Sequence, residues 1–279
     1  MNDSYPFVGI VREREGGSFV SIQRLEQMSA SKDLVNAVVN GPLELAIKRK
    51  GNLIRIEVVA DSMRVGKTTA VAVIAGGLRK QKLGVFESYE DWQHNPYLKK
   101  SYEDPEKNFL ESQKWFIKRK YQQIVDGVGT PLRSTSFGGA RQIFIQDVSP
   151  ECDYNYCVTN LRLGRMSQAH FDEYEKYYHS LDWGLTLLPD LLVYLTIGDD
   201  ELIKRANASR REFESVDSDY FLTMKKVNRE WLKRITNLKF SNSQMKILKI
   251  NTDKLDFAND AEAMKELVER VIKKLTLFE

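Results

Sequence analysis

The clearest chemical signal in the sequence is the run Gly66-Lys67-Thr68, which follows an apolar stretch and opens a segment with helical periodicity. A glycine here lets the backbone approach phosphate oxygens closely, and the free N–H groups at the start of a helix point at the anion. The lysine ammonium can bridge the outer phosphates, and the threonine hydroxyl can ligate Mg²⁺. The run therefore predicts a phosphate-binding loop. Its expected residues are Ser62, Met63, Arg64, Val65, Gly66, Lys67, Thr68 and Thr69.

The loop departs from the usual pattern at its first position. The motif G-x-x-x-x-G-K-[ST] has glycine there, whereas this chain has Asp61. Two unit charges ~5 Å apart at an effective dielectric of ~20 repel each other by roughly 3 kcal/mol. Three outcomes stay open: Asp61 points away from the phosphates, Arg64 compensates its charge, or nucleotide binding is weakened.

The elements that must position this loop alternate between strand and helix from Gly51 onward. The apolar runs expected to form strands are 53–59, 83–86, 142–146, 191–197 and 245–250. The segments with helical periodicity are 67–80, 106–125, 151–163, 167–182, 217–236 and 259–275. This alternation predicts an α/β fold with a parallel sheet covered on both faces, because each crossover helix packs back onto the sheet.

Residues 1–50 differ from the rest and are interpreted as an N-terminal extension to a main domain at 51–279. Two apolar runs flank Gly16-Gly17, which is typical of a hairpin, and a helical pattern follows. The extension contains no residues with evident chemistry. We expect it to pack against the main domain or against a partner.

The composition is that of an ordinary globular protein, with 42% apolar and 29% charged residues among 279. The net charge of +3 is spread along the chain. It gives no electrostatic footprint for binding to nucleic acid or to a membrane, and we expect neither as a partner.

The remaining signals concern metals and location. Cys152 and Cys157 lie five apart in an expected helix, and the three histidines form no metal-binding motif, so we expect two buried thiols and no bound zinc. No apolar stretch approaches the roughly 18 residues of a membrane span. Charged residues at 12–15 come too early for a signal peptide. We therefore expect a cytoplasmic protein.

A second candidate group follows the second expected strand, which ends at Glu87. In parallel α/β sheets, ligands bind at the carboxyl ends of the strands, and we expect this strand to neighbour the one before the phosphate loop. A carboxylate so placed can take the proton from an attacking hydroxyl. Spacing alone favours the simpler interpretation, in which Glu87 caps or pairs locally.

A longer series of residues has the order and spacing of a known family. The series comprises Glu87 to Trp92, Tyr102, Pro105, Phe109, Gln113, Asp147, Ser149, Asp153, Asn160-Leu161, Gly164, Met166, Tyr174, Tyr178, 188–195 and the arginine-rich segment 205–214. It resembles the deoxynucleoside kinases, the family that includes the deoxycytidine and deoxyguanosine kinases. The resemblance spans roughly Arg55 to Trp231.

The resemblance implies a three-layer P-loop kinase fold with a five-stranded parallel sheet, usually in a homodimer. It also implies phosphorylation of a nucleoside 5′-hydroxyl by ATP with Mg²⁺. The residues matching catalytic positions are Glu87, the general base, Lys67, and the lid arginines Arg205 and Arg211. Thr68 and Asp147 are the expected Mg²⁺ positions, with Asp147 acting through water.

The resemblance further implies a nucleoside pocket. Gln113 and Asp153 match positions that hydrogen-bond the base, and a wrong base would leave these buried groups unpaired. The sugar 3′-hydroxyl would be held by Tyr102 and Glu214, and the apolar walls would be Trp92 and Phe116. Ordinary core packing is an equally good interpretation of the two wall residues.

Three residues depart from the family pattern: Asp61, Val148 in place of an arginine, and Ser209 in place of a lid arginine. All three changes act against catalysis as the family performs it, because they add negative charge or remove positive charge around the transferred group. A diverged kinase with another acceptor, or a nucleotide-binding homologue without transfer, therefore stays open. We favour an active enzyme because the other site positions are retained.

Two alternatives remain. A nucleoside monophosphate kinase of the thymidylate kinase type shares the fold, and it would need a basic group for the acceptor phosphate, such as Lys118, Arg119, Lys120 or Arg141. A catalytically silent scaffold would use residues 1–50 to bind a partner. A GTPase is disfavoured, because no guanine-specifying N-K-x-D motif follows the third strand.

Overall fold

The structure is a computed structural model, and it describes residues 53–133, 142–181, 183, 189–208, 217–237 and 245–275. The extension expected at 1–50, with its hairpin and helix, lies outside these residues. Among the described residues, no helix combines the length and the apolar character needed to cross a membrane.

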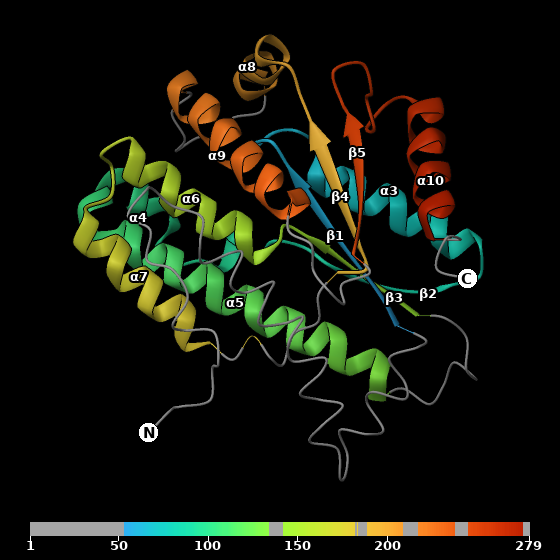
Figure 1. Cartoon of the computed structure of the whole chain (residues 1–279), viewed down its shortest axis with the longest axis horizontal. Coiled ribbons are helices and arrows are strands. Elements are labelled where there is room, and N and C mark those ends of the chain that lie inside the picture. Colours follow the sequence, from blue (N-terminus) through green and yellow to red (C-terminus); the bar gives the residue numbers. More distant parts are fainter. Residues whose placement is uncertain are drawn as a thin grey trace.

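Five parallel strands form the centre of the fold in the order β2-β3-β1-β4-β5 (Figure 1). They are β1 (Leu53–Ala60), β2 (Gly84–Ser88), β3 (Gln142–Asp147), β4 (Leu191–Thr196) and β5 (Lys246–Asn251). The predicted α/β fold with a five-stranded parallel sheet is thus confirmed.

One expected neighbour was wrong. β2 pairs with β3 and not with β1, so that Glu87 lies opposite Ile145. Both sides of β1 are taken by β3 and β4. Burial explains the order: β1 and β3 are buried along their whole length and fit the interior, whereas every residue of β2 is half-buried, as suits an edge strand.

One face of the sheet is apolar. Alternate residues of β1, from Ile54 to Ala60, point to this face and join a single core with α3 (Lys67–Lys80) and α10 (Ala261–Leu275). These two helices lie together on one side of the sheet (Figure 1). This core fixes the helix that begins at the phosphate loop.

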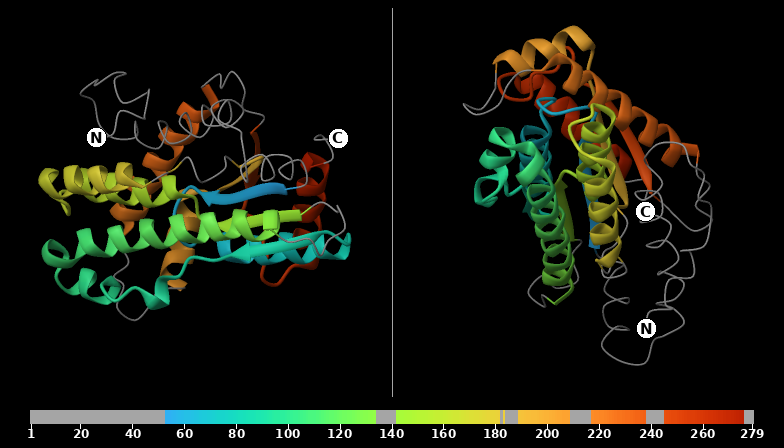
Figure 2. Two further views of the ribbon diagram at one scale, coloured as in Figure 1. Left: turned by 90° about the horizontal axis from the view of Figure 1, so that it is seen from below. Right: turned by 90° about the vertical axis from the view of Figure 1, so that its left-hand side faces the viewer.

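The other face carries α5 (Pro105–Arg133), α6 (Pro150–Arg162) and α9 (Ser218–Asn237), with α7 (Gln168–Ser180) outside them (Figure 1 and Figure 2). Their core is rich in aromatic side chains, including Tyr154, Tyr174, Tyr178, Trp183 and Trp231. Helices on both faces give the three layers, because a parallel sheet must be covered on both sides.

Short elements complete the carboxyl end of the sheet. They are η1 (Trp92–His94), α4 (Leu98–Glu103) and α8 (Asp199–Ala208). Cys152 and Cys157 are free, buried side chains of α6, as predicted.

Candidate active site

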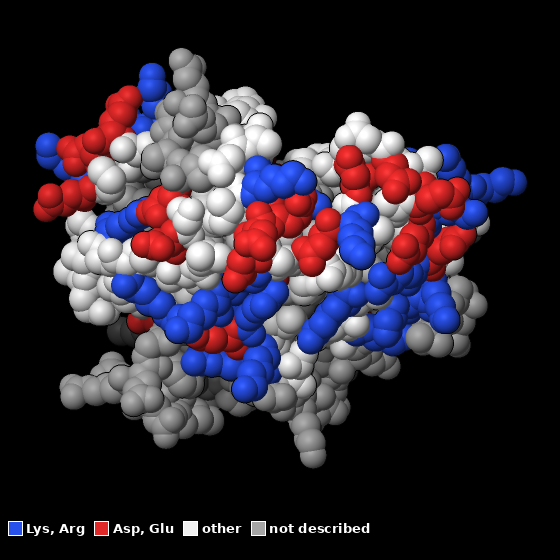
Figure 3. Space-filling view, turned by 90° about the horizontal axis from the view of Figure 1, so that it is seen from above, with Lys and Arg blue, Asp and Glu red and all other residues white. Residues whose placement is uncertain are grey.

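A cavity of about 590 Å³ opens at the carboxyl end of the strands. It lies between the phosphate loop, α4, α5, α6 and the start of α9, and its volume is in the range of small-molecule sites. Figure 3 looks onto this end of the molecule and shows acidic and basic side chains interspersed. A cavity of this size can hold a small-molecule ligand.

The phosphate loop connects β1 to α3 and lines one wall of the cavity with Met63, Arg64 and residues 66–69. Gly66 precedes α3 with φ of 99°, a conformation that side chains rarely adopt. The Lys67 ammonium donates to the carbonyl of Ser62 at 3.2 Å, which folds this side chain back over the loop. The predicted loop therefore has a helix start that faces the cavity.

Ser62 and Val65 of the predicted set are buried and do not line the cavity among the described residues. The Ser62 hydroxyl donates to the carbonyl of Phe221 at 3.2 Å, and Val65 joins the core beneath α3. These two residues hold the loop in place from behind.

The predicted Mg²⁺ residues lie together. The Thr68 hydroxyl donates to Oδ2 of Asp147 at 2.5 Å, and Oδ1 of Asp147 is buried with no hydrogen-bond partner among the described residues. Burial raises the pKa of Asp147, although Lys67 opposes the shift. No group of three metal-ligating side chains occurs in the described part of the chain. A hydroxyl and one carboxylate fit Mg²⁺, which keeps most of its ligands as waters and substrate phosphates.

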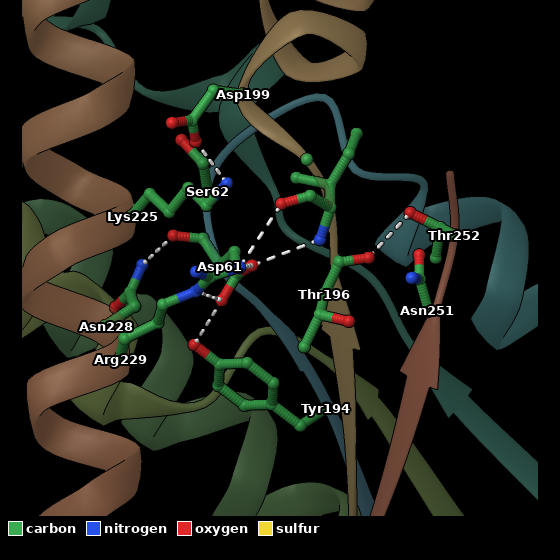
Figure 4. Close-up of polar contacts among 12 residues, drawn as sticks. Asp61, Ser62, Tyr194, Thr196, Asp199, Lys225, Asn228, Arg229, Asn251 and Thr252 are labelled. Carbon is green, nitrogen blue, oxygen red and sulfur yellow. Dashed lines mark hydrogen bonds and ion pairs between the residues drawn. The ribbon is translucent and has the colours of Figure 1, made fainter.

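Asp61 takes the first of the three outcomes left open by the sequence. Its carboxylate is fully buried and turned toward Tyr194 of β4 and Arg229 of α9 (Figure 4), and Asp61 is not among the described residues that line the cavity. A compensating charge comes from Arg229 of α9, with guanidinium-to-carboxylate distances of 3.0 and 2.7 Å.

The expected nucleoside residues Tyr102, Gln113, Phe116 and Asp153 line the same cavity, on α4, α5 and α6. Three helices that are separate in sequence thus bring four of the predicted residues to one wall. Gln113 is buried, and Tyr102 is 40% exposed at the rim.

Asp153 has an incomplete set of partners. Its Oδ1 accepts from the ammonium of Lys120 at 2.8 Å, while Oδ2 is buried without a hydrogen-bond partner among the described residues. Burial raises the pKa of Asp153 to about 6; Lys120 opposes this shift and Glu90 adds to it. Asp153 can therefore accept one more hydrogen bond from a ligand.

Glu87 and Trp92 are not among the described residues that line the cavity. Phe86 packs toward α5, so the strand alternation turns Glu87 to the α3 side, where it pairs with Arg79 and accepts from the Tyr89 hydroxyl. Trp92 is half-buried in η1. Glu90, which lies between β2 and η1, does line the cavity, and its carboxylate is 3.9 Å from the Lys120 ammonium.

Arg205 lies on α8 and holds the phosphate loop from outside the cavity. Its guanidinium donates to Glu201 at 2.8 Å, to the carbonyl of Thr252 at 2.6 Å and to the carbonyl of Val65 at 3.5 Å. The other expected lid and sugar positions, Ser209, Arg211 and Glu214, lie outside the described residues.

Sequence reasoning gave no role to a second group of residues that lines the cavity. Arg165 pairs with Asp217 and lies over the Tyr220 ring at 5.3 Å, and Asn160 donates to the Tyr220 hydroxyl at 3.3 Å. These residues come from the end of α6 and the start of α9. Asn160 carried part of the family resemblance, which was the one available signal.

Val148, which stands where the family has arginine, also lines the cavity. It is buried with φ of 69°, a strained conformation for a β-branched residue, of a kind concentrated at functional sites. Its N–H donates to the carbonyl of Val58 at 3.1 Å, which joins the ends of β1 and β3.

A parallel sheet with a Gly-Lys-Thr loop after its first strand defines a P-loop phosphotransferase fold. Residues 58–276 match the family model described as deoxynucleoside kinase, so the chain belongs to the deoxynucleoside kinase family. It is therefore a phosphotransferase that acts on an alcohol group, and the family uses a nucleotide as phosphate donor.

Similar curated proteins are distant. A deoxyguanosine kinase of Lactobacillus johnsonii is 24% identical over 71% of this chain and 85% of its own length. A deoxyadenosine/deoxycytidine kinase of Bacillus subtilis is 26% identical over 76% and 89%. Among solved structures, deoxyadenosine kinase from M. mycoides aligns with a TM-score of 0.58 and 20% identity, over 81% of this chain and all of the other. That likeness supports the fold.

Proposed function

We propose that this protein transfers the γ-phosphoryl group of ATP to the 5′-hydroxyl of a deoxynucleoside. The observation that carries the proposal is that the phosphate loop and the incompletely paired Asp153 line the same cavity. The hydroxyl oxygen attacks the phosphorus, ADP leaves, and a carboxylate takes the hydroxyl proton.

At the donor end, the loop N–H groups and Lys67 hold the phosphates. Thr68 and Asp147 would hold Mg²⁺, which neutralises charge on the phosphate oxygens. The buried, unpartnered Oδ1 of Asp147 supports this role. Arg205 and Arg211 are proposed to stabilise the transferred group when the lid segment closes.

At the acceptor end, Asp153 and Gln113 are proposed to bind the base, with Phe116 and Trp92 as apolar walls. An ionised carboxylate only accepts hydrogen bonds, so Asp153 favours a base with an exocyclic amino group: adenine, guanine or cytosine. The names of the relatives, which act on deoxyadenosine, deoxycytidine or deoxyguanosine, support this class. Tyr102 and Glu214 would hold the sugar.

Two carboxylates, Glu87 near the end of β2 and Glu90 just after it, are candidates for the proton acceptor. The family resemblance favours Glu87, which would have to leave Arg79 and Tyr89 to reach the cavity. The geometry favours Glu90, which lines the cavity already. Comparing Glu87→Gln with Glu90→Gln separates the two, because only the loss of the true acceptor lowers kcat by the roughly 10²–10⁴-fold of general base catalysis.

A monophosphate acceptor is less well supported. It would need a free basic group, yet Lys120 is bound to Asp153 and Arg119 is bound to Asp91. Lys118 is exposed and is not among the described residues that line the cavity. Arg141 lies outside the described residues. A nucleoside fits these pairings better than its monophosphate.

The wider organisation is also proposed from the family. Residues 1–50 would be an extension to the kinase domain at 51–279, which would act in the cytoplasm as a homodimer. Size-exclusion chromatography with light scattering, on the full chain and on a chain that begins at residue 51, would test the dimer and the dispensability of the extension.

The decisive experiment is an ATP-dependent transfer screen over deoxynucleosides, ribonucleosides and their monophosphates. Lys67→Ala, Glu87→Gln and Glu90→Gln would run beside Glu103→Gln, an exposed carboxylate paired with Lys99 on α4. We expect phosphorylation of a deoxynucleoside whose base carries an exocyclic amino group. This product should be lost in Lys67→Ala and in either Glu87→Gln or Glu90→Gln. Product only from a monophosphate, or none from any acceptor, would overturn the proposal.

A further inference from the structure

Asp61 is surrounded by hydrogen-bond donors from β4, from the segment that follows β4 and from α9 (Figure 4). Oδ1 accepts from Arg229 Nε at 3.0 Å and from the Tyr194 hydroxyl at 3.0 Å. Oδ2 accepts from Arg229 Nη2 at 2.7 Å and from the Ile197 N–H at 3.1 Å. Each oxygen of this fully buried carboxylate thus has two partners, which is what a buried charge needs to be tolerated.

The same helix also holds the backbone of the loop. The Asn228 side chain donates to the carbonyl of Asp61 at 2.9 Å, and Asn228 itself accepts from Asn155 of α6 at 2.9 Å. The Asp61 N–H donates to the carbonyl of Leu195 at 2.9 Å. Asp61 is not among the described non-glycine residues with positive φ, so its side chain sits there without backbone strain. The first turn of the loop is therefore fixed on both of its sides.

From these contacts we infer that Arg229 is a positioning residue for the phosphate loop, acting through Asp61 on the binding of a phosphate-bearing nucleotide. Most P-loops have glycine at this position, and a free carboxylate there would repel phosphate. The guanidinium fork neutralises the carboxylate and holds it against α9, and neither Asp61 nor Arg229 is among the described residues that line the cavity. The inference rests on the proposed function only in requiring that the loop bind nucleotide.

Helix α9 contacts the cavity as well as Asp61. Its first turn supplies Tyr220 and Phe221 to the cavity, and the middle of the helix holds Asp61. Helix α9 therefore lines the cavity and also contacts the phosphate loop, at Ser62 through the Phe221 carbonyl and at Asp61 through Arg229. A change at Arg229 should reach the nucleotide although this side chain does not line the cavity among the described residues.

Replacing Arg229 with glutamine would leave Asp61 buried with half of its hydrogen bonds and no opposite charge. If the carboxylate moved to regain hydrogen bonds, the loop would move with it and would lose its phosphate-binding shape. Removing the charge of Asp61 at the same time, in Asp61→Asn with Arg229→Gln, abolishes the mismatch. A neutral pair at this position should therefore bind nucleotide better than the single Arg229 variant does.

The test is calorimetric binding of Mg-ATP to the full chain in four forms: the parent, Arg229→Gln, Asp61→Asn/Arg229→Gln and Arg162→Gln. Arg162 is the matched control, because it pairs with Glu230 of the same helix and lies outside the described cavity lining. We expect binding about tenfold or more weaker in Arg229→Gln, within about threefold of the parent in the double variant, and unchanged in Arg162→Gln.

Equal affinity in the parent and in Arg229→Gln, or a double variant as weak as the single one, would overturn the inference. So would an equal loss in the Arg162 control, which would mean that any disturbed ion pair on α9 has this effect. Should Arg229→Gln fail to fold, Arg229→Lys keeps the charge without the fork and should bind Mg-ATP with intermediate affinity. Binding is read without turnover, so a parent that binds Mg-ATP but transfers to no acceptor overturns the proposed function alone.

Discussion

Two buried carboxylates, Asp61 and Asp153, lie near the carboxyl end of the sheet. They differ in whether both carboxylate oxygens have hydrogen-bond partners, and this separates a residue that supports the loop from one that can bind a ligand. Both are at most 2% exposed, and each faces a basic side chain. Asp61 has two donors on each oxygen, whereas Asp153 has one oxygen without a partner among the described residues. Burial of a charge alone therefore does not mark a ligand site; an acceptor without a partner, in a residue that lines the cavity, does.

The cations differ in the matching way. Arg229 offers a planar fork that meets both oxygens of Asp61, and its side chain is 51% exposed. Lys120 is a point charge on α5, only 2% exposed, and it meets one oxygen of Asp153. A guanidinium fork can donate to both oxygens of a carboxylate, whereas a single ammonium that donates to one oxygen leaves the other available to a ligand. The comparison predicts different outcomes when each pair is broken.

Breaking the ion pair between Lys120 and Asp153 should cause the largest loss of unfolding free energy. Lys120→Met leaves Asp153 buried without its cation, and loss of one partner of a buried ion pair costs about 3–5 kcal/mol of unfolding free energy. Urea denaturation would measure this loss. The double variant Lys120→Met/Asp153→Leu should recover most of it, because no uncompensated charge remains. A loss below about 1 kcal/mol, typical of exposed pairs, would show that the pair is not buried in solution.

The free oxygen of Asp153 can be tested by a substitution of nearly equal size. Asp153→Asn replaces an acceptor with an amide, and a site built to hydrogen-bond the base should lose roughly 10²–10³-fold in kcat/KM for its deoxynucleoside. The KM for ATP should stay within about threefold, because the phosphate loop is untouched. If the variant were impaired equally toward ATP and toward the deoxynucleoside, the assignment of Asp153 to binding of the base would be contradicted.

Acid should reproduce this loss reversibly. The pKa of Asp153 is about 6, so the group is charged above that pH and neutral below it. Its free oxygen then ceases to be an anionic acceptor, and kcat/KM for the deoxynucleoside should fall about tenfold per pH unit below 6. Steady-state kinetics from pH 5 to 8 would follow this. The Asp153→Asn enzyme should lack this limb, and an unchanged acid limb would assign it to another group.

How much of this could be read from the sequence depends on how local each signal is. The Gly66-Lys67-Thr68 run, with its apolar strand before and its helix after, predicted the loop. The periods of 2 and 3.6 residues predicted the layers, because both are set by neighbours along the chain. The neighbour of β2 was wrong because strand order is decided by which strands bury best, and the period does not carry that information.

Partners far apart in sequence could not be predicted. Asp61 was recognised as unusual, but Arg229 lies 168 residues later on a helix whose position follows from the whole fold. Lys120 was considered only as a group for an acceptor phosphate, although it is the partner of Asp153. The side to which Glu87 points depends on the alternation of β2, in which Phe86 packs toward α5. Each of these is a consequence of tertiary packing.

The smallest loss of unfolding free energy is expected for Asp61→Asn, because the cation that faces Asp61 is half-exposed whereas the one that faces Asp153 is buried. The substitution leaves Arg229 without a carboxylate, but this half-exposed guanidinium can be hydrated, and the amide oxygen still accepts from one of the remaining donors. Unfolding free energy should fall by about 1–3 kcal/mol, the cost of leaving a buried donor without an acceptor. Urea denaturation beside Lys120→Met is the measurement. If Asp61→Asn lost as much as Lys120→Met, the difference in exposure between the two cations would not govern the cost of breaking these pairs.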